Sequence, residues 1–271
     1  MGLQTSKIND LMVGDGLDMR YDIYKIKKLS GIEYFKCDDI ADFNIKKTCE
    51  PVLVKDKRSQ RVFQLINELN HPNIIAPHYF IDNGFFYVVR TYDDDYYAFA
   101  WRLQIQRHLQ SYKKHIEIEE EQIIYWTKQL LTALACLHQN NVLHKFIIPE
   151  AISFKKDRLR LFIPASSEIL ELHDSVVEEK ETWYKCPEHM NNKKIGLKYD
   201  IWSTGWALFN LCSLEDGRFI LKDVEDFKSW KRPDIPRIYT RNLDRIFKMM
   251  TQYDPEERPS AQELLTEKIF N

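Results

Sequence analysis

The hydrophobic pattern of the chain changes near residue 92. Before that point, short β-branched and aromatic runs are separated by Gly, Asp and Asn, which is typical of strands joined by turns. These runs are 21–29, 33–37 and 85–89. A run with helical spacing, 62–69, ends at His71-Pro72-Asn73 and predicts a single helix packed on a small sheet.

After residue 95 the apolar residues recur with helical spacing. The run 119–138 has one apolar stripe and acidic residues in its first turn, which predicts a long helix buried on one face. The run 200–212 is apolar nearly all round, as expected of a central helix, and shorter helical runs follow at 244–250 and 260–270. The pattern predicts an α+β fold with a cleft between two lobes, a small β-rich lobe over 1–91 and a larger α-helical lobe over 92–271.

The charge balance and the cysteines exclude several classes of protein. Lys and Arg number 39 against 41 Asp and Glu, a net charge of -2, so no strong basic field favours nucleic acid. The 5 cysteines are scattered without Cys-x-x-Cys spacing, which favours a reducing, cytoplasmic location and no structural metal. No apolar run approaches about 18 residues, so we expect no membrane span. Gly2 and Ser6 fit the loose N-myristoylation pattern, but we expect an ordinary N-terminus with neither lipid nor signal peptide.

Several short motifs occur in the order in which eukaryotic protein kinases carry them. They are Val142-Leu143-His144 where the catalytic loop begins, Cys186-Pro187-Glu188 at the end of the activation segment, Asp-Ile-Trp-Ser-Thr-Gly at 200–205 and Asp-Pro-Glu-Glu-Arg-Pro-Ser at 254–260. The segment 65–74 is similar to the exit of helix C in NIMA-related kinases. The chain therefore resembles a eukaryotic protein kinase over nearly its whole length, which implies the two-lobed protein kinase-like fold.

This resemblance implies a nucleotide site in the small lobe that is altered in this chain. Gly14 and Gly16 resemble a glycine-rich loop, and Lys36 downstream resembles the lysine of strand three. Lys46 and Lys55 are alternatives for that lysine, and a solvated strand-end lysine is the alternative interpretation of all three.

Two further positions favour weak or absent ATP binding. Counting back from His71 puts Val62 where helix C of a kinase carries the glutamate that orients the lysine. Arg90 takes the gatekeeper position beside the adenine pocket, where an unpaired buried cation is costly, unless a shift of one residue turns it outward. We expect no cofactor.

The catalytic positions implied by the resemblance hold apolar residues. The base position is Phe146, the phosphate-facing lysine position is Ile148, the metal-binding asparagine position is Ala151, and the metal-binding aspartate position is Ile163 or Pro164. Phenylalanine and isoleucine accept no proton, and magnesium requires oxygen ligands. The resemblance then implies a pseudokinase, which is a kinase homologue that is not an enzyme. Nearby acids that offer an alternative are Glu150 and Asp157.

The residues that kinases use to maintain the shape of the large lobe are present. The resemblance implies a buried ion pair between Glu188 and Arg258. It also implies that Asp200, at a helix start, binds the backbone of the catalytic loop and that His144 lies in a stack of side chains through the lobe.

Our leading hypothesis from the sequence is a scaffold or allosteric regulator that binds a protein partner, either an active kinase or a kinase substrate. The alternatives are a serine/threonine kinase with displaced catalytic residues and an ATP-binding sensor without phosphoryl transfer. Candidate contact surfaces are a basic segment, 102–115, and an acidic segment, 166–181, although charge runs of this kind are usually solvated faces. Ser166, Ser167 and Ser175 are hydroxyls on which another kinase could act.

Overall fold

The computed structural model describes the backbone of residues 21–29, 32–39, 42–53, 57–75, 78–82, 85–92, 97–98, 118–155, 157–163, 167–170, 184, 186–191, 194–213, 220–221 and 225–271. Side chains are described at 61–62, 64–66 and 68–75, and within these ranges from 118 onward except at 150, 155 and 168. The chain divides into two compact units, Met1–Asn70 with Ile75–Tyr96 and His71–Ile74 with Tyr97–Asn271. The sequence places the division between residues 91 and 92, whereas the main junction of these units lies between Tyr96 and Tyr97.

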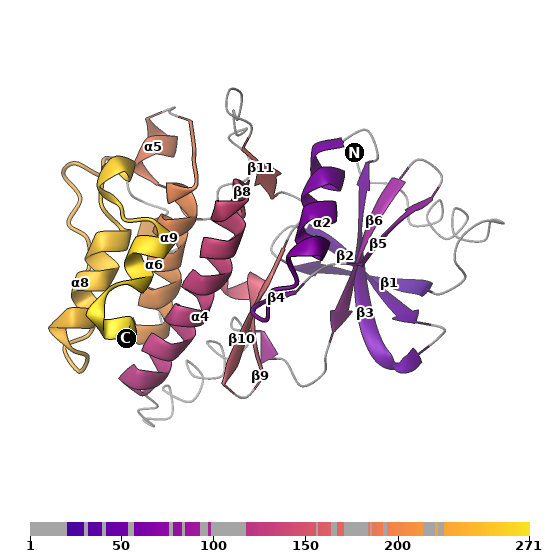
Figure 1. The fold of residues 1–271 in the computed structure, drawn as a ribbon, viewed down its shortest axis with the longest axis horizontal. Coiled ribbons are helices and arrows are strands. Elements are labelled where there is room, and N and C mark those ends of the chain that lie inside the picture. Colours follow the sequence, from indigo (N-terminus) through magenta and orange to yellow (C-terminus); the bar gives the residue numbers. More distant parts are fainter. Residues whose placement is uncertain are drawn as a thin grey trace. The chain divides into compact units, whose positions relative to one another are not determined.

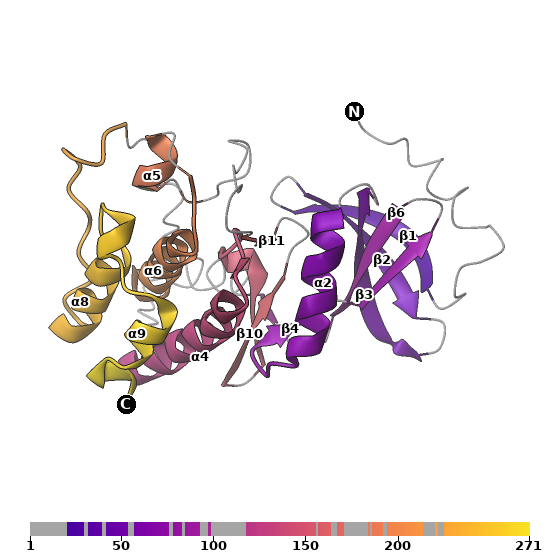
Figure 2. The ribbon, with the colours of Figure 1, turned by 45° about the horizontal axis from the view of Figure 1, so that its top comes forward.

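The described part of the first unit contains a 5-stranded antiparallel sheet and one helix. In chain order the strands are β1 (Tyr21–Leu29), β2 (Ile32–Asp39), β3 (Asp42–Leu53), β5 (His78–Asp82) and β6 (Phe85–Tyr92), and across the sheet the order is β1-β2-β3-β6-β5. Helix α2 (Lys57–Leu69) lies alongside the sheet (Figures 1 and 2). Its Val62 and Ile66 are buried one helical turn apart, whereas Arg61 and Glu68 are exposed. Within the described residues of this unit, the predicted small sheet with a helix beside it is confirmed.

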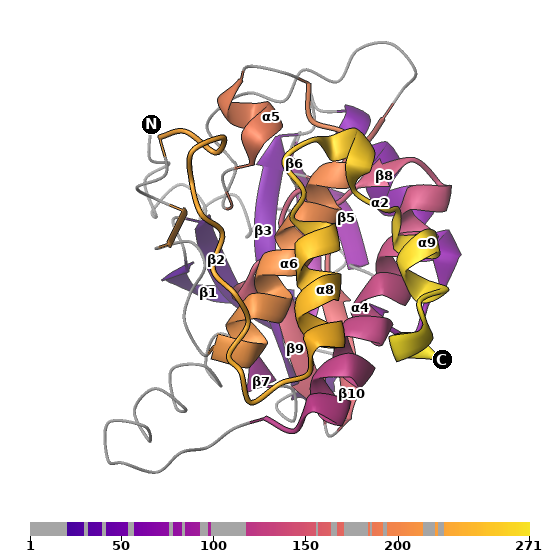
Figure 3. The ribbon, with the colours of Figure 1, turned by 90° about the vertical axis from the view of Figure 1, so that its left-hand side faces the viewer.

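The second unit is mainly helical. Its described helices are α4 (Glu120–Gln139), α5 (Pro187–Met190), α6 (Lys198–Ser213), α8 (Arg241–Met250) and α9 (Ala261–Leu265), with short 3-10 turns η1 (Pro149–Ala151), η3 (Pro255–Glu257) and η4 (Lys268–Phe270). Helix α6 is buried from Tyr199 to Cys212, and α4 and α8 pack beside it (Figure 3). The long amphipathic helix and the fully buried central helix predicted from the sequence are both confirmed.

Short strands complete the second unit. Strands β4 (Ile74–Ile75), β10 (Arg158–Phe162), β9 (Ile152–Lys155) and β7 (Tyr97–Ala98) form one sheet, and β8 (Val142–Leu143) pairs with β11 (Glu168–Ile169). The β9–β10 hairpin packs on α4, where the rings of Trp126 and Phe154 lie 4.3 Å apart. The sequence predicts this hairpin but not β8 or β11, because two residues are too few to show alternation. Within the described residues, no helix has both the length and the hydropathy to cross a membrane.

Helices α6 and α8 approach each other closely at Gly205. A Cβ atom at Gly205 would lie 2.7 Å from Thr251 Cγ2 and 2.9 Å from Met250 Cβ, both nearer than real Cβ contacts. Next to this glycine in the sequence, Trp206 of α6 meets the ring of Phe247 of α8 edge to face at 5.6 Å. The glycine therefore sets the spacing of the two helices, and an apolar cluster of aromatic rings fills the rest of the interface.

We expect Gly205→Ala to destabilise the second unit. Separating α6 from α8 costs about 1–3 kcal/mol of packing strain, which exceeds the roughly 1 kcal/mol that alanine gains in helix propensity. Thr251→Ser removes the clashing Cγ2 but keeps the Thr251 hydroxyl that bonds Phe247 O at 2.7 Å, so we expect Gly205→Ala/Thr251→Ser to recover part of the loss. Urea unfolding of the two single variants and the double variant measures this coupling. An additive double variant would mean that these two residues do not clash.

Candidate functional site

The candidate site is the loop that follows β8 and ends in η1, which corresponds to the catalytic loop of the kinase resemblance. His144 opens the loop and is completely buried. Its Nδ1 accepts a hydrogen bond from the Phe146 backbone N–H at 3.1 Å, so the ring proton is on Nε2, which donates to Phe162 O at 2.7 Å. Burial lowers the pKa of His144 to about 4, against a smaller opposing effect of the Asp200 carboxylate. The neutral ring therefore joins the loop to the end of β10.

This pKa predicts a pH dependence of stability. The folded-state pKa of about 4 lies below the ordinary value of 6.5, so the unfolded chain binds more protons between those pH values. The free energy of unfolding should therefore rise with pH across this window. As the pH falls from 6.5 to about 4, we expect a total loss of about 3 kcal/mol. His144→Gln retains an N–H for Phe162 O but does not titrate. We expect the plot of unfolding free energy against pH to be flatter for the variant than for the wild type between pH 4 and 6.5, and parallel curves would contradict this assignment.

Asp200 holds the backbone of the same loop from the first turn of α6. Its buried carboxylate accepts hydrogen bonds from the amides of His144 at 2.8 Å and Lys145 at 2.9 Å. His138, at the end of α4, places its Nε2 3.0 Å from Asp200 Oδ2. Lys145 has φ of 65°, in the left-handed region that a residue with a Cβ rarely adopts. The contacts to Asp200 therefore stabilise a strained turn at the start of the loop.

The loop positions to which the resemblance assigns catalytic roles hold apolar residues. Phe146, Ile148 and Ala151 are buried, and so is Ile163, which follows directly after β10. These side chains offer neither a proton acceptor nor an oxygen ligand at the positions where the resemblance implies them. Pro164 lies outside the described residues. Within the part of the chain that the structure describes, no group of three His, Cys, Asp or Glu side chains is arranged to hold a metal ion.

The two acids that offer an alternative base differ in their positions. Glu150 is the middle residue of η1, within the loop itself, and its side chain is not among those described. Asp157 is exposed at the turn between β9 and β10, and its carbonyl oxygen accepts from Gln129 Nε2 at 2.8 Å. The position of Asp157 at a hairpin turn is the one that the sequence suggested.

Ser167 is tied to the same loop. Its hydroxyl is buried and donates to His144 O at 3.0 Å, next to the β8–β11 pairing. Burial keeps this hydroxyl away from another kinase in the folded protein. Ser166 and Ser175 lie outside the described residues, as do the basic segment 102–115 and most of the acidic segment 166–181.

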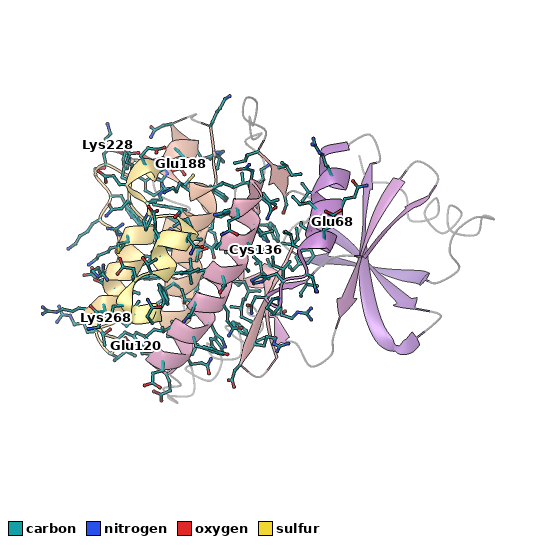
Figure 4. All side chains as sticks on the ribbon, viewed as in Figure 1. Glu68, Glu120, Cys136, Glu188, Lys228 and Lys268 are labelled. Carbon is teal, nitrogen blue, oxygen red and sulfur yellow. The ribbon has the colours of Figure 1, made fainter. Side chains whose placement is uncertain are left out.

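Glu188, which Figure 4 labels, forms a buried ion pair with Arg258 within the second unit. Two parallel bonds join Arg258 Nη1 to Glu188 Oε1 at 2.6 Å and Arg258 Nη2 to Oε2 at 2.7 Å. The guanidinium also donates to Gln252 O at 2.8 Å and Lys198 O at 3.2 Å, and its Cζ lies 4.9 Å from the centre of the Trp202 ring. This arrangement connects α5, which follows the activation segment, to the chain between η3 and α9.

The strand order favours Lys46 over Lys36 as the lysine of the third strand. Lys36 lies on β2, paired with Thr48 of β3, whereas protein kinases carry the ATP-binding lysine on the third strand. Lys46 lies on β3, paired with Tyr92, and is the alternative that fits. Within the described residues, the hairpin that connects Leu29 of β1 to Ile32 of β2 comes first, and it lies after Gly14 and Gly16 in the sequence.

The remaining nucleotide-site residues are only partly described. Gly14, Gly16 and Lys55 lie outside the described residues. Arg90 lies on β6, paired with Thr48. Its side chain is not described, so the gatekeeper assignment remains a prediction. Val62, at the position of the helix C glutamate, is buried on α2.

Sequence reasoning missed two residues that shape the loop. His138 contacts Asp200, and Lys145 adopts the left-handed conformation. For His138, the only sequence signal is its place in the last turn of a predicted helix, because cations favour helix C-termini. No sequence signal marks the second, since lysine rarely adopts positive φ.

Comparisons with known proteins identify relatives of the chain. The family model described as "Protein kinase domain" matches residues 39–270. Serine/threonine-protein kinase Nek4 of Mus musculus is 24% identical over 218 residues, covering 77% of this chain and 26% of the relative. Nek11 of Mus musculus is 28% identical over 211 residues, covering 74% and 32%, and Nek3 of Oryza sativa subsp. japonica is 34% identical over 156 residues, covering 54% and 26%. The chain thus spans between a quarter and a third of the length of these relatives.

These relatives correct the prediction that the chain is not an enzyme. That prediction rested on the apolar residues at Phe146, Ala151 and Ile163. The matched proteins are named serine/threonine-protein kinases, which points to an enzyme. The prediction gave the nearby acids Glu150 and Asp157 less weight than the apolar catalytic positions, and spacing alone does not support that preference. The resemblance to NIMA-related kinases is confirmed.

Proposed function

Because the chain belongs to the protein kinase domain family, we propose that it is a serine/threonine protein kinase whose catalytic residues are displaced from their usual positions. The observation that carries this proposal is the match of the kinase model to residues 39–270, together with relatives named serine/threonine kinases. The reaction is transfer of the γ-phosphoryl group of ATP to a serine or threonine hydroxyl of a protein substrate.

The framework around the loop supports this proposal. Phosphoryl transfer depends on positioning and electrostatics more than on covalent chemistry, so a rigid loop is a requirement. Asp200 holds the amides of His144 and Lys145, and Ser167 binds the His144 carbonyl oxygen. Each of these groups is buried, so the loop has little freedom to rearrange.

Glu150 is the acid that we propose to accept the proton of the substrate hydroxyl. The hydroxyl oxygen forms a bond to the γ-phosphorus, the bond to the bridging oxygen breaks, ADP leaves, and the proton passes to the carboxylate. Glu150 belongs to η1, between the buried residues Pro149 and Ala151, so its backbone is fixed. Asp157 is less suitable because it is exposed at a hairpin turn. The described residues do not fit a magnesium site, and we assign no step to a metal.

The test measures transfer of radiolabelled phosphate from ATP to dephosphorylated casein, with magnesium or manganese. We expect transfer by the wild type and a kcat about 10²- to 10⁴-fold lower for Glu150→Gln, the usual effect of removing a general base. Glu256→Gln is the matched control, because Glu256 is also the middle residue of a 3-10 turn that begins with proline, and it is exposed. Absence of wild-type transfer above a reaction without enzyme would refute the kinase activity. Wild-type transfer with an unaffected Glu150→Gln would refute only the role of Glu150.

A second pair of variants tests the lysine assignment. Lys46→Met should raise the KM for ATP, because Lys46 occupies the third strand, whereas Lys36→Met on β2 should leave it nearly unchanged. The reverse result would return the role to Lys36.

A further inference from the structure

A β-turn before α8 exposes an apolar side chain beside two cations. The Tyr239 N–H donates to Pro236 O at 3.0 Å and closes the turn, so that Arg237 and Ile238 occupy its corner. Ile238 is 57% exposed, more than Tyr125 at 50% and Tyr253 at 38%, the other large apolar residues exposed in the described part of the chain. We name residues 236–241 the Arg237 turn.

The Arg237 turn is held firmly on the second unit. Tyr239 donates its hydroxyl to Ile118 O at 3.1 Å, just before α4. The backbone N–H of Thr240 donates to Glu120 Oε2 at 2.7 Å, and the Thr240 hydroxyl donates to Oε1 at 2.6 Å. Thr240 is also the N-cap of α8. These contacts from α4 and α8 preorganise the turn, so a partner that binds it would order little additional chain.

The cations of the turn lack compensation, in contrast to those further along α8. Arg237 and Arg241 are exposed, and neither makes an ion pair or a hydrogen bond within the described part of the chain. Arg245 pairs with Glu267, and Lys248 pairs with Asp234 at 2.7 Å and Asp244 at 2.6 Å.

The position of Arg241 is itself unfavourable. Arg241 is the first residue of α8, where the helix dipole disfavours a positive charge. The adjacent carboxylate of Glu120 already accepts two bonds from Thr240. The next acids on the same end of α4, Glu119 and Glu121, are exposed but form no ion pair with either arginine among the described contacts. An exposed isoleucine and two unpaired guanidinium groups on a rigid turn are more easily explained by binding than by folding.

We propose that the Arg237 turn is a docking surface for an acidic segment of a protein partner, in which carboxylates flank an apolar side chain. Guanidinium groups bind carboxylates through two parallel hydrogen bonds, and Ile238, which lies between Arg237 and Arg241 in the sequence, supplies exposed apolar area. A membrane is a weaker match, because two cations contribute only about 1 kcal/mol each at an anionic surface and one isoleucine inserts little apolar area. This inference does not depend on phosphoryl transfer.

The test uses a fluorescent peptide of repeating Glu-Glu-Leu units and measures its binding to the full chain by anisotropy at low salt. We expect Arg237→Glu/Arg241→Glu to weaken binding about tenfold or more, and Ile238→Ser to weaken it about threefold. Lys228→Glu/Lys231→Glu is the matched control, since it makes the same charge change at two exposed residues. Glu120, which contacts the turn, and Lys228 lie at opposite ends of the second unit (Figure 4). Thermal unfolding verifies that all the variants are folded.

Several results would overturn the proposal. One is the absence of peptide binding by the wild type. Another is an equal loss of affinity in both charge-reversal variants, which would show that the peptide responds to the overall charge of the protein and not to the Arg237 turn. Unchanged binding by Ile238→Ser, or equal binding of a Glu-Glu-Ser peptide, would remove the apolar part and with it the docking surface as stated. Arginine-dependent binding to phosphatidylserine vesicles without peptide binding would indicate a membrane instead of a protein partner.

Discussion

Arg258→Ala should destabilise the second unit by about 5 kcal/mol, and Glu188→Ala should destabilise it by about 3 kcal/mol. Each change leaves the partner charge buried, because the side chains are only 0% and 2% exposed. Arg258→Ala additionally leaves the carbonyl oxygens of Gln252 and Lys198 without their donor and removes the contact with Trp202. The loss of Arg258 should therefore cost more stability than the loss of Glu188.

Urea unfolding of the two single variants and the double variant measures this difference. The double variant should lose far less than the sum of the single losses, because removing both charges leaves neither one stranded. The matched control is Arg245→Ala, which breaks an Arg–Glu pair whose arginine is 49% exposed and should change stability by less than about 1 kcal/mol. Small and additive losses at Glu188 and Arg258 would show that this pair is solvated in solution.

Asp200→Ala should destabilise the protein by about 4 kcal/mol. The substitution leaves two buried backbone N–H groups, those of His144 and Lys145, without an acceptor, and each unsatisfied group costs about 1–3 kcal/mol. Without these bonds the left-handed conformation of Lys145 also loses its support. Asp200→Asn should cost about half as much, because one oxygen still accepts an N–H bond.

Urea unfolding and hydrogen exchange of the His144 and Lys145 amides measure this effect. Both amides should exchange faster in Asp200→Ala than in the wild type, and the Asn variant should be intermediate. Asp254→Ala is the control, since exposed Asp254 accepts from the Glu256 N–H at the start of η3, and its loss should cost only about 1 kcal/mol. Unchanged exchange at His144 and Lys145 in Asp200→Ala would contradict the role given to Asp200.

If Asp200→Ala does not fold, Asp200→Asn alone still tests the prediction. Its two amides must exchange faster than in the wild type while the amides of α8 keep their protection, because α8 makes no hydrogen bond to Asp200 among the described contacts. Uniform loss of protection would indicate global destabilisation instead of a local role in the loop.

Much of the candidate site could be predicted from the residue types at the motif positions of the sequence. The sequence predicts Glu188 and Arg258 as a buried pair because both lie in kinase-like motifs, at the positions where kinases form such a pair. The apolar residues Phe146, Ile148 and Ala151 were also evident directly. Their consequence for catalytic activity was not evident from the sequence, because the spacing of residues does not reveal which other carboxylates lie near the loop.

Periodicity was sufficient for the elements with one large apolar face. The run 119–138 became α4 and the run 200–212 became most of α6, because burial of a continuous stripe or of a whole helix determines helix formation locally. The pairing of the strands could be determined only from the tertiary structure. Lys36 and Lys46 both look like strand lysines, and only the order β1-β2-β3 distinguishes them, since hydrogen bonds between strands do not depend on the identity of one side chain. The left-handed Lys145 likewise exists because Asp200, 55 residues later, binds its N–H, and a contact over that distance leaves no local pattern in the sequence.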